Sequence, residues 1–142
     1  MKILLLLFLT IFLGRGCDED QKQDMETAII EYSANTRGYF LKITVKEKMI
    51  SITKDRNETK QVFEKISALD SNEIMASVKE INLEELANLK APTEKRFYDG
   101  AAIGILKITY KNRIYETSGF DHGIPPVEIE RLVKKLNAMV KE

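Results

Sequence analysis

Residues 39–45 read YFLKITV and carry the clearest strand signal in the chain. Tyr39, Leu41, Ile43 and Val45 occupy alternate positions, which is the spacing of a strand that buries one of its faces. Directly before them, residues 35–38 (NTRG) predict a turn, because Asn and Gly tolerate the backbone angles that a chain reversal needs. We therefore expect short strands joined by tight turns, and the neighbouring sequence extends this pattern.

Three further strands are predicted beside this one. Apolar residues alternate with polar ones over residues 28–32, and residues 49–53 (MISIT) have the composition of another strand. Residues 61–66 (QVFEKI) are interpreted as a fourth strand, because Val62 and Phe63 suit a strand. The alternative for this last segment is the beginning of a helix.

Two helices are predicted from apolar spacing. Asp70 followed by Glu73 has the pattern of a capping box at a helix start. Apolar residues then recur at helical spacing: Ile74, Met75, Val78 and Ile81. Pro125 and Pro126 are expected to begin the second helix, since a missing amide hydrogen is tolerated in the first turn. The apolar stripe of that helix is Ile129, Leu132, Val133, Leu136, Met139 and Val140.

A second strand pair lies between the two helices. Residues 102–111 and 113–120 are predicted strands joined tightly around Asn112. The order β-β-β-β-α-β-β-α predicts a single small α+β domain over residues 26–142. We expect an antiparallel sheet of about five to six strands with both helices on one face. The chain has 142 residues, enough for one domain of ordinary size.

The first 16 residues, MKILLLLFLTIFLGRG, have the pattern of an export signal. Lys2 gives a positive start, and the apolar run of residues 3–13 is too short to span a bilayer, which needs about twenty residues. Gly14 and Gly16 then precede Cys17, which is the only Cys of the chain. A single unpaired thiol in an exported protein favours a dedicated use for the sulfur.

This arrangement resembles a bacterial lipoprotein signal with its lipobox. The resemblance implies cleavage before Cys17, which would become the first residue of the mature protein and carry its acyl chains. The alternative is an ordinary secretory signal followed by an incidental Cys. Residues 17–25 (CDEDQKQDM) are polar and acidic, and we interpret them as a flexible tether.

The acidic residues after Cys17 resemble the export tag that sends many Bacteroidota lipoproteins to the outer face of the outer membrane. The resemblance implies an exported protein that is lipid-anchored in the cell envelope and exposed at the surface. The alternative is a solvated linker whose charge carries no address. In either case the acyl chains on Cys17 are the expected contact with the membrane.

Composition excludes several classes of function. Lys and Arg number 22, and so do Asp and Glu, so the chain lacks the basic excess of a nucleic-acid module. One His and one Cys are too few for a metal site built on several such ligands. No glycine-rich phosphate loop, nucleophile elbow or zinc-protease motif is present. We therefore expect no nucleic-acid partner, no metal, no cofactor and no catalytic set.

Two segments carry the candidate functional residues. Asp121 and His122, in SGFDHGIPP, have the chemistry of a general base or a lone metal ligand, although a structural role in a strand-to-helix turn is favoured. Arg96, Tyr98 and Asp99, in EKRFYDG, are residue types that recognise partners from loops. The plainer interpretation pairs Arg96 with a carboxylate, buries one of the neighbouring aromatic rings and makes Asp99 part of a turn.

Three segments of the chain carry a resemblance to known proteins. EYSANTRGYF, LKAPTEKRFYDGAAIGILKITY and FDHGIPPVEIERLV resemble a group of short Bacteroidota lipoproteins with no assigned activity. The layout of early strands, middle helix, strand pair and proline-led last helix is also similar to emfourin-type inhibitors of metallopeptidases. We expect a non-catalytic, lipid-anchored binding or accessory module that contacts a protein partner through residues 93–100 and 119–124. The alternatives are a peptidase inhibitor and a small hydrolase that uses His122.

Overall fold

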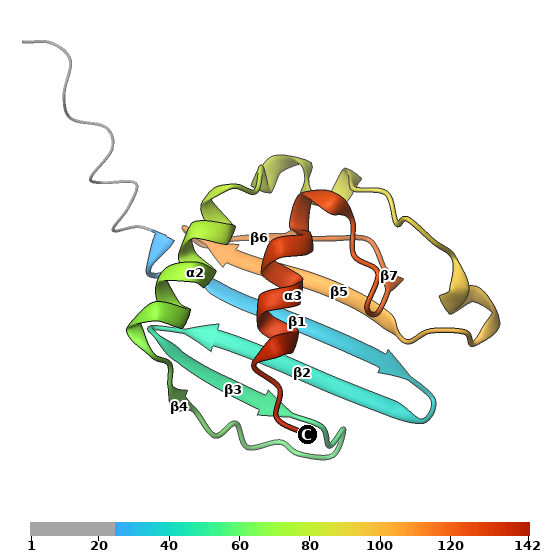
Figure 1. The fold of residues 1–142 in the computed structure, drawn as a ribbon, viewed down its shortest axis with the longest axis horizontal. Coiled ribbons are helices and arrows are strands. Elements are labelled where there is room, and N and C mark those ends of the chain that lie inside the picture. The colour runs from blue at the N-terminus through green and yellow to red at the C-terminus, as the bar shows by residue number, and fades with distance from the viewer. Residues whose placement is uncertain (1–24) are drawn as a thin grey trace, which may run out of the picture.

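The centre of the molecule is an antiparallel sheet, shown in Figure 1 for a computed structural model that describes residues 25–142. Its seven strands are β1 (Ile29–Thr36), β2 (Tyr39–Lys46), β3 (Met49–Thr53), β4 (Glu64–Lys65), β5 (Ile103–Tyr110), β6 (Arg113–Glu116) and β7 (Phe120–Asp121). Six of them lie side by side in the order β4-β3-β2-β1-β5-β6, and β7 pairs with β5. The first strand of the sheet in the sequence is therefore central in space.

Both longer helices cover the same face of this sheet (Figure 1). They are α2 (Ala68–Lys79) and α3 (Glu130–Ala138). Three short 3-10 helices lie in the connections: η1 (Leu83–Asn88), η2 (Lys95–Tyr98) and η3 (Val127–Ile129). The predicted α+β fold, with an antiparallel sheet and two helices on one face, is confirmed.

The core lies between the sheet and the helices. In the register of the sheet, Tyr32 of β1 stands between Ile43 of β2 and Leu106 of β5, and all three side chains are fully buried. The helices contribute the opposite wall of the core: Ile74, Val78, Leu132, Val133 and Leu136. Burial of this apolar surface is the main force that holds the two layers together.

The first helix begins earlier than the capping pattern predicted. Ser67 is its N-cap, because the Ser67 hydroxyl accepts a hydrogen bond from the amide of Asp70 and donates one to the Asp70 carboxylate at 2.8 Å. Glu73 has a different role, since it forms an ion pair with Lys135 of α3. Lys135 also pairs with Asp70 at 2.6 Å, so the acidic residues of α2 tie the two helices together.

The strand predicted over residues 113–120 is divided into β6 and β7 by a bulge. Lys107 lies opposite Glu116, whereas Gly104 lies opposite Phe120, so one strand has one more residue than the other between these pairs. Thr117 fills the break, because its amide donates to the carbonyl of Leu106 and its hydroxyl accepts from the amide of Leu106. This division raises the number of strands from the expected five or six to seven.

Two other predictions need adjustment. Residues 61–66 do contain a strand, but β4 covers only Glu64–Lys65, and Val62, which suggested the strand, lies outside it and is 64% exposed. The last helix starts with the 3-10 turn η3 after Pro126, and regular α-helix begins only at Glu130.

The predicted signal peptide (residues 1–16), Cys17 and nearly all of the predicted tether lie outside the described residues. Met25, where the description starts, packs against the core as a partly buried side chain. Within residues 25–142, no helix combines the length and apolar character that crossing a bilayer would require.

Candidate functional site

The carboxylate of Asp121 joins β7 to the segment that follows residue 92. The side chain is completely buried, and its Oδ2 atom accepts hydrogen bonds from the Thr93 hydroxyl at 2.5 Å and the Lys95 amide at 2.8 Å. Its Oδ1 atom accepts from the amide of Arg96 at 2.9 Å and from the Arg96 guanidinium at 3.2 Å. One carboxylate thus fixes the start of η2 from across the fold.

These hydrogen bonds determine the charge state of Asp121. Burial by itself would raise the pKa of the carboxyl group, but the hydrogen bonds from Thr93, Arg96 and Lys95 outweigh it and lower the pKa to about 2. Asp121 is therefore ionised throughout the physiological range. Its charge is balanced by Arg96, whose side chain is only 12% exposed.

The segment held in this way presents two aromatic side chains to solvent. Phe97 is 70% exposed and Tyr98 is 72% exposed. The Arg96 guanidinium carbon lies 4.3 Å from the centre of the Phe97 ring. Asp99 then takes a left-handed conformation with φ of 58°, and Gly100 donates its amide to the Lys95 carbonyl at 2.8 Å. The docking loop, defined as residues 93–100, is thus closed at both ends by hydrogen bonds.

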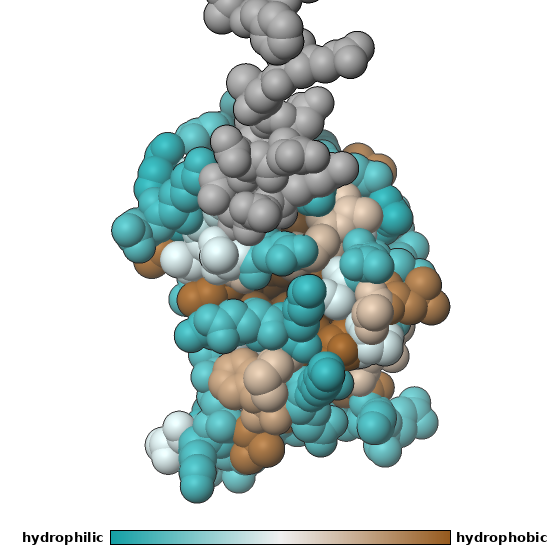
Figure 2. Space-filling model, turned by 90° about the vertical axis from the view of Figure 1, so that its left-hand side faces the viewer, coloured by the Kyte–Doolittle hydropathy of each residue, from teal (hydrophilic) through white to brown (hydrophobic). Residues whose placement is uncertain are grey.

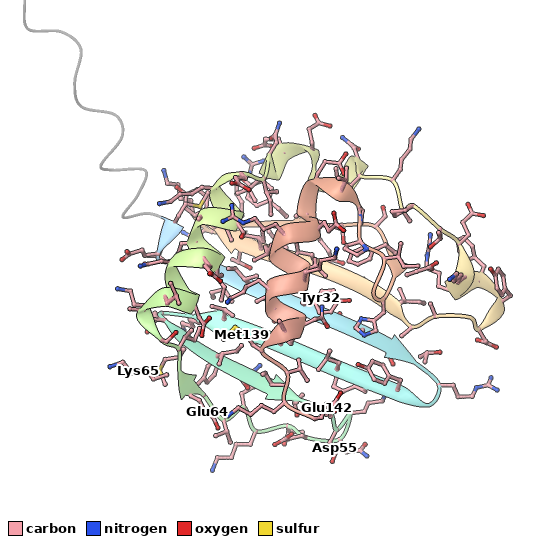
Figure 3. All side chains as sticks on the ribbon, viewed as in Figure 1. Tyr32, Asp55, Glu64, Lys65, Met139 and Glu142 are labelled. Atoms are coloured by element: carbon pink, nitrogen blue, oxygen red, sulfur yellow. The ribbon has the colours of Figure 1, made fainter. Side chains whose placement is uncertain are left out.

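His122 lies beside this loop but faces the helical layer. Its Nδ1 atom is 2.7 Å from the hydroxyl oxygen of Tyr32, and its Nε2 atom is 3.4 Å from that of Tyr39. Its backbone amide donates to the carbonyl of Ala102 at 2.9 Å. Tyr32 of β1 is completely buried in the core, and Figure 3 labels it beside α3. The imidazole therefore links β1 and β2 to the segment that follows β7.

The environment of these rings favours their uncharged forms. Burial lowers the pKa of His122 below its ordinary value of 6.5, and burial raises the pKa of Tyr32. With the imidazole neutral, one ring nitrogen donates a hydrogen bond and the other accepts one. Such a ring can serve as a half-buried connector between two hydroxyl groups.

The hydroxyl groups nearest in sequence to His122 are engaged elsewhere. Thr117 is bonded to the backbone of Leu106, and Ser118 donates to the carbonyl of Ala87 at 3.4 Å. Among residues 25–142, neither forms a hydrogen bond with His122. A hydrolase that uses His122 as a base would need a nucleophile next to the imidazole, and neither of these two hydroxyl groups is placed to be one.

The five predicted site residues fall into two adjoining groups. Arg96 and Asp121 form the buried base of the docking loop, and Tyr98 and Asp99 form its exposed end. His122 belongs to the second group, in which it contacts the hydroxyl groups of Tyr32 and Tyr39. The expected pairing of Arg96 with a carboxylate and the expected turn are both present. The expected burial of Phe97 or Tyr98 is wrong, because both rings point to solvent.

Sequence reasoning missed Phe97 and Thr93 as parts of the site. Two adjacent aromatic residues, Phe97 and Tyr98, directly before the Asp99-Gly100 turn could have indicated an exposed aromatic pair. The role of Thr93 depends on its contact with Asp121, which is far away in the chain. Residues 25–142 contain no group of three or more acidic, His or Cys side chains arranged to hold a metal ion.

The docking loop lies at the end of the sheet opposite to Met25. β1 runs away from Met25, and its residue Asn35 pairs with Ile103, which follows the loop. Eight strand residues separate the two ends by about 27 Å. Figure 1 shows this arrangement, and Figure 2 looks at the Met25 end, where most of the visible surface is hydrophilic.

No protein-family model, no curated protein and no solved structure matches this chain. Arguments about function therefore depend on the geometry of the docking loop and its surroundings.

Proposed function

We propose that this protein is a lipid-anchored lipoprotein of the cell envelope that acts as a non-catalytic binding or accessory module for a protein partner. The observation that carries the proposal is the exposed pair Phe97 and Tyr98 on a loop whose base is fixed by Asp121. Aromatic side chains contribute a large share of binding energy at protein interfaces. A loop that is ordered before binding loses little conformational entropy when it docks.

The position of the loop suits an anchored protein. In the proposal, acyl chains on Cys17 hold the chain at the membrane, and residues 17–24 form the tether to Met25. Such a tether reaches at most about 3.5 Å per residue. The docking loop, at the opposite end of β1, would then point away from the lipid surface toward a partner.

A peptidase is a second class of partner that this geometry would suit. Inhibitors need a preordered loop that enters a partner's cleft and keeps its conformation there. The docking loop is preordered, although residues Lys95–Tyr98 form a 3-10 turn instead of an extended, substrate-like strand. An inhibitor of this kind would act by blocking the cleft, and not by imitating a substrate.

The test is a cross-linking capture from intact producing cells with the full chain. The variant Phe97→Ser/Tyr98→Ser removes the exposed rings, and Val127→Ser is the matched control, because Val127 is 75% exposed away from the loop. We expect one partner to be captured by the wild type and the control, and lost from the double variant. Equal capture of this partner by all three proteins would contradict the proposal. Assay of the captured partner for peptidase activity, with and without the chain, distinguishes an inhibitor from an accessory protein.

A further inference from the structure

The face of the sheet that points away from α2 and α3 carries a row of alternating charges. Glu31 of β1 lies opposite Lys107 of β5, and Lys107 lies opposite Glu116 of β6. On the other side of Glu31, Lys42 of β2 places its Nζ atom 3.4 Å from the carboxylate, and the Lys107 Nζ atom is 2.8 Å away. From β2 to β6 the row therefore reads positive, negative, positive, negative.

Apolar side chains surround this row on the same face. Ile114 is 66% exposed and Ile103 is 44% exposed. Three more apolar residues on this face are partly exposed: Ile29, Phe40 and Ile105. An antiparallel sheet commonly leaves one face to water, but such a face is usually polar. This one combines exposed apolar side chains with an ordered pattern of charge.

This face is covered at two places within the described part of the chain. At the end of β5, Asp121 lies opposite Ile103 and is buried by its contacts with Thr93, Lys95 and Arg96. The second place is on β2 and β3. Thr44 of β2 and Ser51 of β3 are buried, and the side-chain amide of Gln61 donates to the Thr44 hydroxyl at 3.2 Å. The helices lie on the other side of the sheet (Figure 1). The uncovered surface thus consists of β1, β5, β6 and the part of β2 that carries Lys42.

We propose that this face binds a second copy of the chain, with a twofold axis that is parallel to the strands and passes between β1 and β5. With this axis, β1 faces β5 of the second copy, and β2 faces β6. Glu31 then faces Lys107 of the second copy. Lys42 lies two residues along the strand from the level of Glu31, but its Nζ atom reaches back to Glu31 and in this way comes to the level of Glu116 of the second copy. Every charge in the row meets one of opposite sign, and the exposed isoleucines become buried in a sheet-on-sheet contact.

The charge pattern also selects this axis over the other possible one. An axis across the strands at the level of Glu31 would place each strand over the same strand of the second copy, so that Glu31 would face Glu31 and Lys107 would face Lys107. Like charges in contact oppose association. The axis parallel to the strands keeps both Met25 ends on one side of the dimer, which, if the proposed lipid anchor holds, lets both copies attach to one membrane. The docking loop borders this face where Asp121, which holds the loop, lies opposite Ile103. The residues substituted in the tests of the two proposals are different, so each proposal is tested by itself.

The first test is the mass of the full chain as its producing cells process it, measured by sedimentation in density-matched detergent. Ile114→Arg places a charge on the β6 side of the uncovered face, and Val127→Arg is the control at an exposed residue outside it. We expect a dimer whose dissociation constant rises at least about tenfold in Ile114→Arg and stays within about twofold in Val127→Arg. A wild-type monomer at about 100 µM, or equal effects of the two substitutions, would overturn the proposal.

The second test is a charge exchange between residues that meet only across the interface. Lys42 and Glu116 lie on strands three spacings apart in one chain, about 14 Å. Lys42→Glu and Glu116→Lys each create a like-charge contact in the dimer, and the double variant restores opposite charges. We expect each single variant to weaken the dimer about tenfold and the double variant to recover most of that loss. Additive weakening in the double variant, with unchanged melting temperatures, would contradict the proposed axis.

Discussion

Asp121 connects two segments that are far apart in the sequence. Its side chain lies at the end of a two-residue strand, yet it satisfies two backbone amides, one hydroxyl and one guanidinium of a segment far away in the sequence. The expectation that Asp121 is structural and that Arg96 pairs with a carboxylate was available from residue types alone. Their pairing with each other was not, because nothing in the intervening sequence specifies which carboxylate and which cation meet.

Replacement of Asp121 by Asn should destabilise the fold strongly. An amide offers one acceptor oxygen, and its NH2 group faces either the amide of Lys95 or the amide of Arg96, where two donors then oppose each other. The substitution also leaves the buried guanidinium of Arg96 without a counter-charge. We expect a loss of about 2–4 kcal/mol in the free energy of unfolding, measured by urea denaturation. Asp99→Asn is the matched control, because Asp99 is exposed and Asn tolerates its left-handed backbone. Equal stability of the two variants would show that the Asp121 contacts contribute little.

His122 should make the stability of the protein fall on mild acidification. Burial lowers the folded-state pKa of His122 below 6.5, so the unfolded chain binds the proton more readily. The stabilisation is complete above pH 6.5 and is lost as pH falls below that value, because protonation then favours the unfolded state. We expect the melting temperature to fall more between pH 7 and pH 5 in the wild type than in His122→Gln. Parallel pH profiles would contradict this role, and Asp121, with a pKa of about 2, remains ionised over this range.

At the scale of elements, apolar spacing in the sequence predicted individual strands and helices correctly. It did not predict the bulge, which depends on how two strands pair. The alternation in residues 39–45 correctly predicted β2, and the apolar stripe correctly predicted α3. The bulge at residues 117–119 left no comparable mark in the sequence. Its extra residue inverts the alternation, so that Ile114 is 66% exposed on the open face while Phe120 is 1% exposed in the core. Sequence pattern alone placed both residues in a single strand.

Gly104 is the residue of β5 that permits this packing. A Cβ atom at Gly104 would lie 2.8 Å from the ring of Phe120 and 3.0 Å from the hydroxyl oxygen of Tyr32. We expect Gly104→Ala to destabilise the protein by about 1–3 kcal/mol, because both neighbours are buried in a close-packed core. Thermal unfolding measures the effect. Gly38→Ala is the control, since a Cβ atom there meets no atom within 4 Å, and equal losses in both variants would rule out the steric explanation.

At the scale of the whole molecule, the helices, the docking loop and the Met25 end occupy different sides of one sheet (Figure 1). The general architecture followed from the order of strands and helices in the sequence. The exposure of Phe97 and Tyr98 did not, because hydropathy predicts burial for such side chains and only the tertiary structure leaves them outside. The proposed anchor concerns residues outside the described part of the chain, and it is tested separately from the fold.

The proposed anchor predicts where the protein is found in its producing cells. Acylation at Cys17 should place the wild-type chain in the membrane fraction, because more than one buried acyl chain gives stable attachment. Cys17→Ser should move the folded domain to the soluble fraction, and the N-terminal peptide should lose the mass of the acyl groups. Fractionation followed by mass spectrometry measures both effects. The same membrane distribution and peptide mass for the two proteins would contradict lipidation.

The central place of β1 in the sheet also has a consequence for how the chain folds. β1 pairs with β2 through a two-residue turn. Its other neighbour, β5, is synthesised only after α2 and the docking loop. Local hairpins form quickly, whereas pairings between distant segments form slowly. During synthesis, the edge of β1 that will receive β5 therefore stays open while the first three strands are already present. Open edges recruit other strands, so this edge is where aggregation would begin and where a chaperone would first be needed.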